Sequence, residues 1–107
     1  MTFEELVTAV RDAYATVDVS NVDEHVAIEV HVRGEGDGAF YIEIRKDGVA
    51  VEPYEYYDRD AIITTSAEAI LAIARGELDV EDADNSGTIR IRGNIDKTYM
   101  LNEIIYT

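Results

Sequence analysis

The sequence predicts an α+β fold, a mainly antiparallel five-stranded sheet with helices packed on one face, in a single domain covering residues 1–107. Five segments carry strand patterns and three carry helical spacing or helix caps. Their order is helix, three strands, strand, helix, strand, helix, and this lack of strict alternation indicates α+β. A chain of 107 residues suits one hydrophobic core and leaves no room for two domains.

A helix opens the chain. Thr2 and Glu5 have the spacing of a capping box, in which each side chain bonds the other residue's backbone amide. Apolar residues recur behind them at helical spacing, which predicts a helix over 3–17. The polar, turn-rich residues 18–24 then form a connection.

Three strands follow. Residues 26–32 alternate between apolar and mostly polar side chains, and so do residues 40–45, which is typical of half-buried strands. The Asp-Gly pair at 47–48 suits a tight type I′ turn, which predicts a hairpin into a strand at 49–51. Pro53 lacks an amide hydrogen, so the end of this strand lies at an edge or a bulge.

The second half begins with a short β-branched strand at 61–65. Ser66 then caps a helix that Gly76 ends. The acidic stretch 77–86 is irregular in pattern, with room for one helical turn.

A fifth strand at 88–92 alternates isoleucine with arginine. Asn94 caps a last helix, which carries Met100, Leu101, Ile104 and Ile105.

The acidic stretch raises the hypothesis of a calcium site. Residues 82–89 match the first eight positions of an EF-hand loop. The ninth position is the cation Arg90, however, and the twelfth is Gly93 instead of a bidentate glutamate. A tight acidic turn explains the same residues, so no metal site is predicted here.

The charge balance excludes several partners. Twenty-three acidic residues face nine Lys and Arg, which gives a formal charge of −14. Such a surface repels phosphate backbones and anionic headgroups, so we expect no nucleic acid and no stable membrane association. No apolar run approaches the roughly 20 residues of a membrane helix, and no leader opens the chain. The expected location is cytoplasmic.

Catalytic and metal-binding patterns are weak. The chain has no cysteine, and Ser20, Ser66 and Ser86 occupy turn or cap positions. His31 shares a strand face with Glu29, but two histidines do not make a structural zinc site, and both are interpreted as solvated. The glycine-rich loop at 34–38 precedes a strand, whereas a phosphate cradle precedes a helix. We therefore expect neither an enzyme nor a cofactor.

Three tyrosines, Tyr54, Tyr56 and Tyr57, cluster after the third strand. Tyrosines with one polar end often line interfaces or the mouths of ligand sites. They are interface candidates for a possible homodimer. A half-buried edge strand explains them equally well.

Four segments occur in an order and spacing that resemble the sterol carrier protein-2 (sterol-binding domain) family. They are residues 51–53 (VEP), 61–68 (AIITTSAE), 71–79 (LAIARGELD) and 87–94 (GTIRIRGN). The resemblance implies a five-stranded sheet with helices on one side and an apolar tunnel between these layers. It further implies a ligand such as a sterol, fatty acid or acyl-CoA, and no catalytic residue or metal.

The ligand-binding candidates are apolar residues from strands and helices that face one another across this tunnel: Phe40, Ile63, Leu71, Ile89, Ile91, Met100, Leu101 and Ile104. A filled core would use the same residues. The leading hypothesis is a non-enzymatic binding domain for an apolar small molecule or lipid. The alternative is a closed-core homodimeric or protein-interaction module of the same fold.

Overall fold

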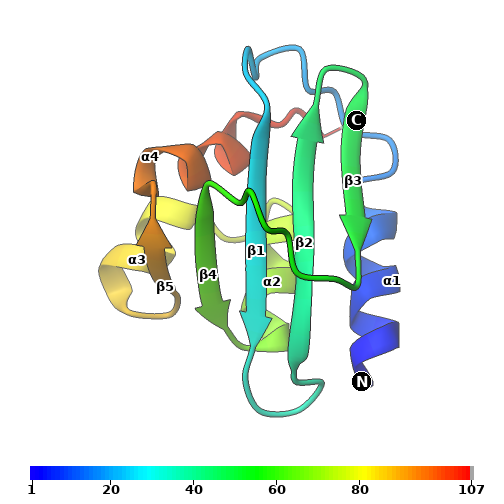
Figure 1. The fold of residues 1–107 in the computed structure, drawn as a ribbon, viewed down its shortest axis with the longest axis vertical. Helices are drawn as coiled ribbons and strands as arrows, with labels where there is room; N and C mark the ends of the chain where they lie inside the picture. Colours follow the sequence, from blue (N-terminus) through cyan, green and yellow to red (C-terminus); the bar gives the residue numbers. More distant parts are fainter. Residues whose placement is uncertain (107) are drawn as a thin grey trace.

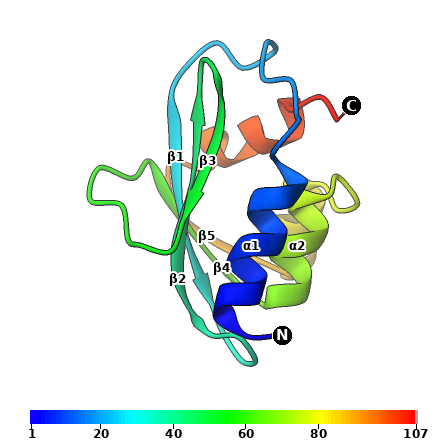
Figure 2. The same ribbon diagram turned by 90° about the vertical axis from the view of Figure 1, so that its right-hand side faces the viewer.

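One layer of the molecule is a five-stranded sheet and the other is helical, as seen in the computed structural model of residues 1–106 (Figure 1, Figure 2). The strands are β1 (Val26–Val32), β2 (Gly38–Arg45), β3 (Gly48–Glu52), β4 (Ala61–Thr65) and β5 (Arg90–Gly93). The helices are α1 (Phe3–Ala13), α2 (Ala67–Ala74), α3 (Val80–Ser86), α4 (Ile95–Thr98) and the 3₁₀-helix η1 (Tyr99–Glu103). The helices lie on the same side of the sheet, which confirms the predicted α+β architecture.

The strand order is β3-β2-β1-β4-β5. The pairs β1–β2, β2–β3 and β4–β5 are antiparallel and the pair β1–β4 is parallel, so the sheet is mainly antiparallel, as predicted. To reach β4, the chain must return from the edge strand β3 past β2 and β1. Residues 53–60 make this return over the face opposite the helices (Figure 2). We call them the crossing segment, and that face of the sheet the open face.

Side-chain caps start the helices where the sequence predicts. The Thr2 hydroxyl accepts the Glu5 amide at 3.1 Å, and the Glu5 carboxylate accepts the Thr2 amide at 2.8 Å. Ser66 accepts the Ala69 amide at the start of α2. Within residues 1–106, none of the helices combines the length and apolar character that crossing a bilayer requires.

The first helix ends at Ala13, four residues before the predicted end at 17. The Tyr14 and Ala15 amides donate to the Arg11 and Asp12 carbonyls, three residues back, so the last turn tightens and the helix ends. The Asp18 amide donates to the Ile105 carbonyl at 2.8 Å, and the Ile105 amide donates to the Asp18 carbonyl at 2.9 Å. This bridge pairs the two backbones in β fashion, so Ile105, predicted in the last helix, lies in the bridge instead.

The acidic stretch is more regular than predicted. It contains α3, which begins at Asp79, whose carboxylate accepts the Asp82 amide at 3.0 Å. The helix ends at Gly87 with a φ of 79°. Residues 82–86 therefore have helical backbone, and the EF-hand loop does not form.

The fifth strand starts two residues later than predicted. The amides of Thr88 and Ile89 donate to the Ala83 carbonyl at 2.9 and 3.3 Å. These bonds wind the chain around the end of α3, so Arg90 is the first residue that pairs with β4.

The middle strand β1 is buried on both faces, whereas its alternating pattern predicted a half-buried strand. Val26, Ile28 and Val30 face the helices and are fully buried. On the open face, Ala27 is 0% exposed and Glu29 is 1% exposed. The crossing segment covers them, because it passes directly over β1 (Figure 1).

At Gly93, β5 lies close to the end of the crossing segment. Gly93 has a φ of +97°, and a Cβ there would lie 2.8 Å from the Asp60 carbonyl oxygen and 3.0 Å from the Ala61 Cα. Both of these contacts are backbone atoms, so neither moves freely.

We expect Gly93→Ala to lower the free energy of unfolding more than Gly34→Ala. Gly34 has a φ of +85° with open space around it, so alanine there suffers backbone strain of about 1–2 kcal/mol alone. Overlap with the Asp60 backbone adds about 1–3 kcal/mol at Gly93. Urea denaturation of both variants measures the difference, and equal destabilisation would contradict the proposed close approach.

Candidate functional site

The predicted ligand-binding residues on the sheet form one row on the helix-covered face. Phe40 pairs with Val30, Val30 with Ile63, and Ile63 with Ile91, across four neighbouring strands. Residues directly opposite in register point to the same face. Phe40 and Ile63 are fully buried, and Ile91 at the end of the row is half-buried.

The other predicted residues approach this row from the helical layer. Leu71 lies in α2, Ile89 precedes β5, Leu101 belongs to η1, and Ile104 follows it; these four are buried. Met100 is half-buried against the same core. The structure therefore brings the predicted residues together in one apolar cluster, with their side chains packed on one another between the layers.

A largely apolar groove of about 700 Å³ opens at one end of these layers. One wall is the connection between α1 and β1, and the other is the end of the β2–β3 hairpin. Its lining residues are Val19, Ser20, Val22, Asp23, Glu24, His25, Arg45 and Lys46. Its volume is within the range of about 300–1,000 Å³ typical of small-molecule sites. The sequence analysis missed it, because its walls are distant in sequence.

A second hollow of about 430 Å³ lies beside η1. Leu101 and Ile104 line it together with Ile73 and Tyr106. Asp79 and Asp82 also reach it, so its lining is more polar than that of the groove. Of the eight predicted ligand-binding residues, Leu101 and Ile104 belong to this hollow.

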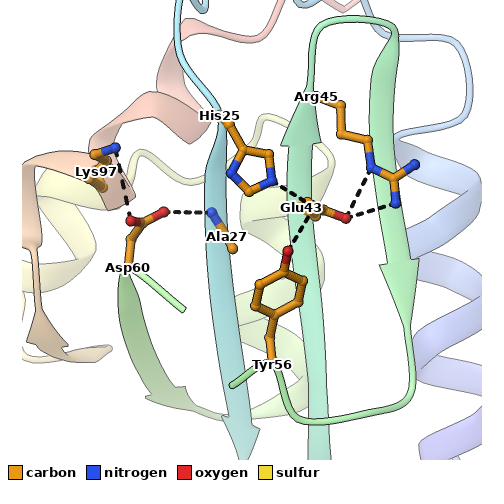
Figure 3. Close-up of polar contacts among 7 residues, drawn as sticks. All are labelled: His25, Ala27, Glu43, Arg45, Tyr56, Asp60 and Lys97. Carbon is orange, nitrogen blue, oxygen red and sulfur yellow. Dashed lines mark hydrogen bonds and ion pairs between the residues drawn. The ribbon is translucent and has the colours of Figure 1, made fainter. Parts of the chain in front are cut away.

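On the open face, Glu43 of β2 is the centre of a dense polar cluster (Figure 3). Its Oε1 accepts two hydrogen bonds from the Arg45 guanidinium, at 3.0 Å from Nε and 2.8 Å from Nη2. Its Oε2 lies 2.6 Å from His25 Nε2 and accepts the Tyr56 hydroxyl at 3.0 Å. Glu43 is only 6% exposed, so these partners replace its water.

Burial by itself raises the pKa of the Glu43 carboxyl. The hydrogen bonds from His25, Arg45 and Tyr56 and the charge of Arg45 outweigh it, and the pKa lies below its ordinary value. The carboxylate form is therefore the stable one in the fold.

Glu29 of β1 forms a second cluster nearby. Its Oε2 bonds His31 Nε2, and its Oε1 accepts the Tyr56 amide at 3.0 Å and lies 3.8 Å from Arg59 Nε. Burial raises its pKa, but the hydrogen bonds from His31 and Tyr56 and the charge of Arg59 prevail and lower it. Tyr56 thus ties the crossing segment to both buried carboxylates.

Asp60 holds the far end of the crossing segment (Figure 3). Its Oδ2 accepts the Ala27 amide at 2.8 Å, and its Oδ1 lies 3.9 Å from Lys97 Nζ. Lys97 Nζ also lies 3.3 Å from Glu24 Oε2. The segment is therefore fastened to the sheet at Tyr56 in its middle and at Asp60 at its end.

Of the two histidines predicted to be solvated, His25 is exposed, whereas His31 is partly buried. Each of them contacts a buried carboxylate. Glu55 of the crossing segment also approaches Glu29 and His31. The spacing of Glu29 and His31 indicated a shared face, but no pattern in the sequence points to Glu55 as the third residue.

The three predicted interface tyrosines have different environments. Tyr56 packs edge-on against Tyr41, with ring centroids 5.0 Å apart, and belongs to the Glu43 cluster. Tyr54 and Tyr57 are 64% and 93% exposed on the protruding crossing segment.

Known proteins share this fold, and a family model covers nearly the whole chain. The model of the SCP-2 sterol transfer family matches residues 3–105. The chain belongs to this family. The resemblance seen in the sequence is thereby confirmed, and the sheet with its helices on one side is the SCP-2 fold. Comparison with the curated proteins gives no match.

Solved structures share the SCP-2 fold at low sequence identity. Sterol carrier protein-2 like-3 from Aedes aegypti is 21% identical, with a TM-score of 0.65 over 94% of this chain and 92% of that one. Palmitated SCP2L2 from the same mosquito is 20% identical, with a TM-score of 0.61 over 96% and 93%. The sec-alkylsulfatase Pisa1 from Pseudomonas sp. is 14% identical, with a TM-score of 0.70 over 85% of this chain. This SCP-2 domain spans only 14% of that chain.

We expect Glu43→Gln to lower the free energy of unfolding by about 1–3 kcal/mol at neutral pH, since buried donors lose their charged acceptor. A carboxyl whose folded pKa is depressed stabilises the fold above its unfolded pKa, and this stabilisation is lost as pH falls through the folded pKa. The difference in free energy of unfolding between the unmodified protein and Glu43→Gln should therefore be smaller at about pH 3 than at about pH 5. Urea denaturation at both values tests this, and a difference independent of pH would contradict it.

Proposed function

We propose that this SCP-2 domain is a non-enzymatic binding domain for an apolar small molecule or lipid such as a fatty acid, acyl-CoA or sterol. The observation that carries the proposal is the family match over 3–105, in a family described by sterol transfer. The palmitated mosquito relative supports an acyl chain as one ligand class.

The ligand is proposed to bind between the sheet and the helices. The row of Phe40, Ile63 and Ile91 supplies one wall, and the residues that face it supply the other. These residues are Leu71, Ile89, Met100, Leu101 and Ile104. Each methylene that a lipid buries there contributes about 0.8 kcal/mol. Since the side chains pack on one another without ligand, binding requires the layers to separate or rotamers to change.

The groove beside Val22 is the proposed mouth. It is larger and more apolar than the hollow beside η1, and Val19 in its wall belongs to the core. Arg45 and Lys46 at its rim are positive groups near which an acyl chain could leave its carboxylate, and they offset the acidic Asp23 and Glu24 of the same lining. In a chain with a charge of −14, a lining whose two bases balance its two acids repels an anionic headgroup less than the surface as a whole does.

The polar clusters support binding rather than catalysis. The buried carboxylates Glu29 and Glu43 are held by hydrogen bonds to the sheet and the crossing segment. A general base needs a reactive group within reach, but these contacts occupy the carboxylates with structural donors.

Native mass spectrometry of the freshly purified protein, followed by unfolding and organic extraction, tests the proposal directly. We expect an additional mass of a few hundred daltons that is released on unfolding and identified as a lipid. Titration with a fluorescent fatty acid then gives an affinity. A clean mass together with no displaceable fluorescent binding would sink the proposal.

We expect Val22→Trp to weaken fatty-acid binding by at least about tenfold, or about 1.4 kcal/mol, because the indole fills the groove. Thr8→Trp on the exposed surface of α1 is the control, and it should change the affinity by less than about twofold. Equal affinities of both variants would place the mouth elsewhere while leaving lipid binding intact.

The exposure of Tyr54 and Tyr57 favours a second candidate function, a closed-core module that forms a homodimer through the crossing segment. We expect the double variant Tyr54→Ala with Tyr57→Ala to weaken such a dimer without loss of folding, because neither side chain is buried. Sedimentation velocity across a concentration series measures it. A monomer at every concentration for the unmodified protein would exclude this candidate.

A further inference from the structure

Three potential metal ligands converge on the open face. Glu29 and His31 are two residues apart on β1, so both side chains point to that face. Glu55 reaches them from the crossing segment. One carboxylate oxygen of each glutamate and one His31 ring nitrogen all lie within 4.8 Å of one another.

We propose that Glu29, His31 and Glu55 form a binding site for a divalent transition-metal ion such as Zn²⁺. One imidazole nitrogen and two carboxylate oxygens are a donor set that suits this ion, with water completing the coordination. The imidazole favours Zn²⁺ over Mg²⁺ and Ca²⁺, which prefer oxygen donors alone.

Glu29 is oriented for this role by its other contacts. Its Oε1 accepts the Tyr56 amide at 3.0 Å and faces the Arg59 guanidinium at 3.8 Å. Its Oε2 is left to His31. The ion would replace that single hydrogen bond with two metal–ligand bonds, while the Tyr56 contact keeps the carboxylate in place. Such outer contacts commonly fix metal ligands.

The local charge also suits a cation. The carboxylates of Glu29 and Glu55 carry two negative charges, and Arg59 supplies one positive charge. The remaining charge of −1 lies beside a side chain that is 1% exposed. A divalent ion therefore compensates the remaining charge, which the exposed Glu55 brings next to the buried Glu29.

The pair His25–Glu43 on the same face provides an internal comparison. It also joins a histidine to a buried carboxylate, but Arg45 and Tyr56 occupy the Glu43 oxygens. Within residues 1–106, the convergence of three or more such donors is found at Glu29, His31 and Glu55 alone. Only the His31 pair is thus predicted to bind metal.

The ion would bind the crossing segment to the sheet. Glu55 is exposed and belongs to that segment, whereas Glu29 and His31 belong to the middle of β1. Coordination therefore adds a link between them, and protease cleavage within 53–60 should slow when metal is bound.

The test uses the whole chain, freed of metal by chelation and dialysis, and titrated with Co²⁺ and Zn²⁺ in millimolar Mg²⁺. The Mg²⁺ occupies exposed carboxylates, which are numerous in this chain. We expect one equivalent of Co²⁺ to bind with visible d–d bands, and Zn²⁺ to displace it. His31→Gln and Glu55→Gln should each weaken binding by at least about tenfold.

His25→Gln is the matched control, and its affinity should stay within about twofold of the unmodified protein. Circular dichroism confirms that each variant is folded, and Glu55→Gln changes only an exposed side chain. The proposal is overturned if the unmodified protein binds neither ion under these conditions. Binding that survives both His31→Gln and Glu55→Gln, or that His25→Gln weakens equally, overturns it as well.

Discussion

Two carboxylates buried on the open face constrain much of this fold. A buried carboxylate without partners costs several kcal/mol, so Glu29 and Glu43 require donors. Neighbouring strand residues supply some of them, and Tyr56 supplies one to each carboxylate from the crossing segment. The crossing segment exists because β4 pairs in parallel with β1 and the chain must return from the opposite edge. The sheet topology therefore places the crossing segment over the buried carboxylates, and its hydrogen bonds to them hold the segment on the sheet.

Local physical rules accounted for most of the secondary structure. The capping box at Thr2, the Asp-Gly turn at 47–48 and the alternation in 26–32 act through neighbouring residues, so the sequence reveals them. The predictions were wrong where contacts between residues distant in sequence determine the local structure or the burial. Ile105 lies outside the last helix because it pairs with Asp18, and β1 is buried on its second face because the crossing segment covers it.

The same distinction between local patterns and long-range contacts applies to the candidate site. The apolar residues facing one another across the layers followed from periodicity and from the resemblance to sterol carrier domains. The groove, the donors around Glu43 and the approach of Glu55 to His31 did not, because each joins segments that only the folded chain brings together. The composition does not reveal them either, since two buried carboxylates among 23 acidic residues carry no distinguishing pattern.

The bridge between Asp18 and Ile105 has a consequence for the order of folding. It joins residues 87 positions apart, so it forms only after residue 105 has been synthesised. Contacts of such long sequence separation form late, because closing a long loop costs entropy before the contact rewards it. The connection that follows Asp18 is one wall of the groove. During synthesis the sheet and α1 therefore have the chance to assemble first, and the groove acquires its final shape last.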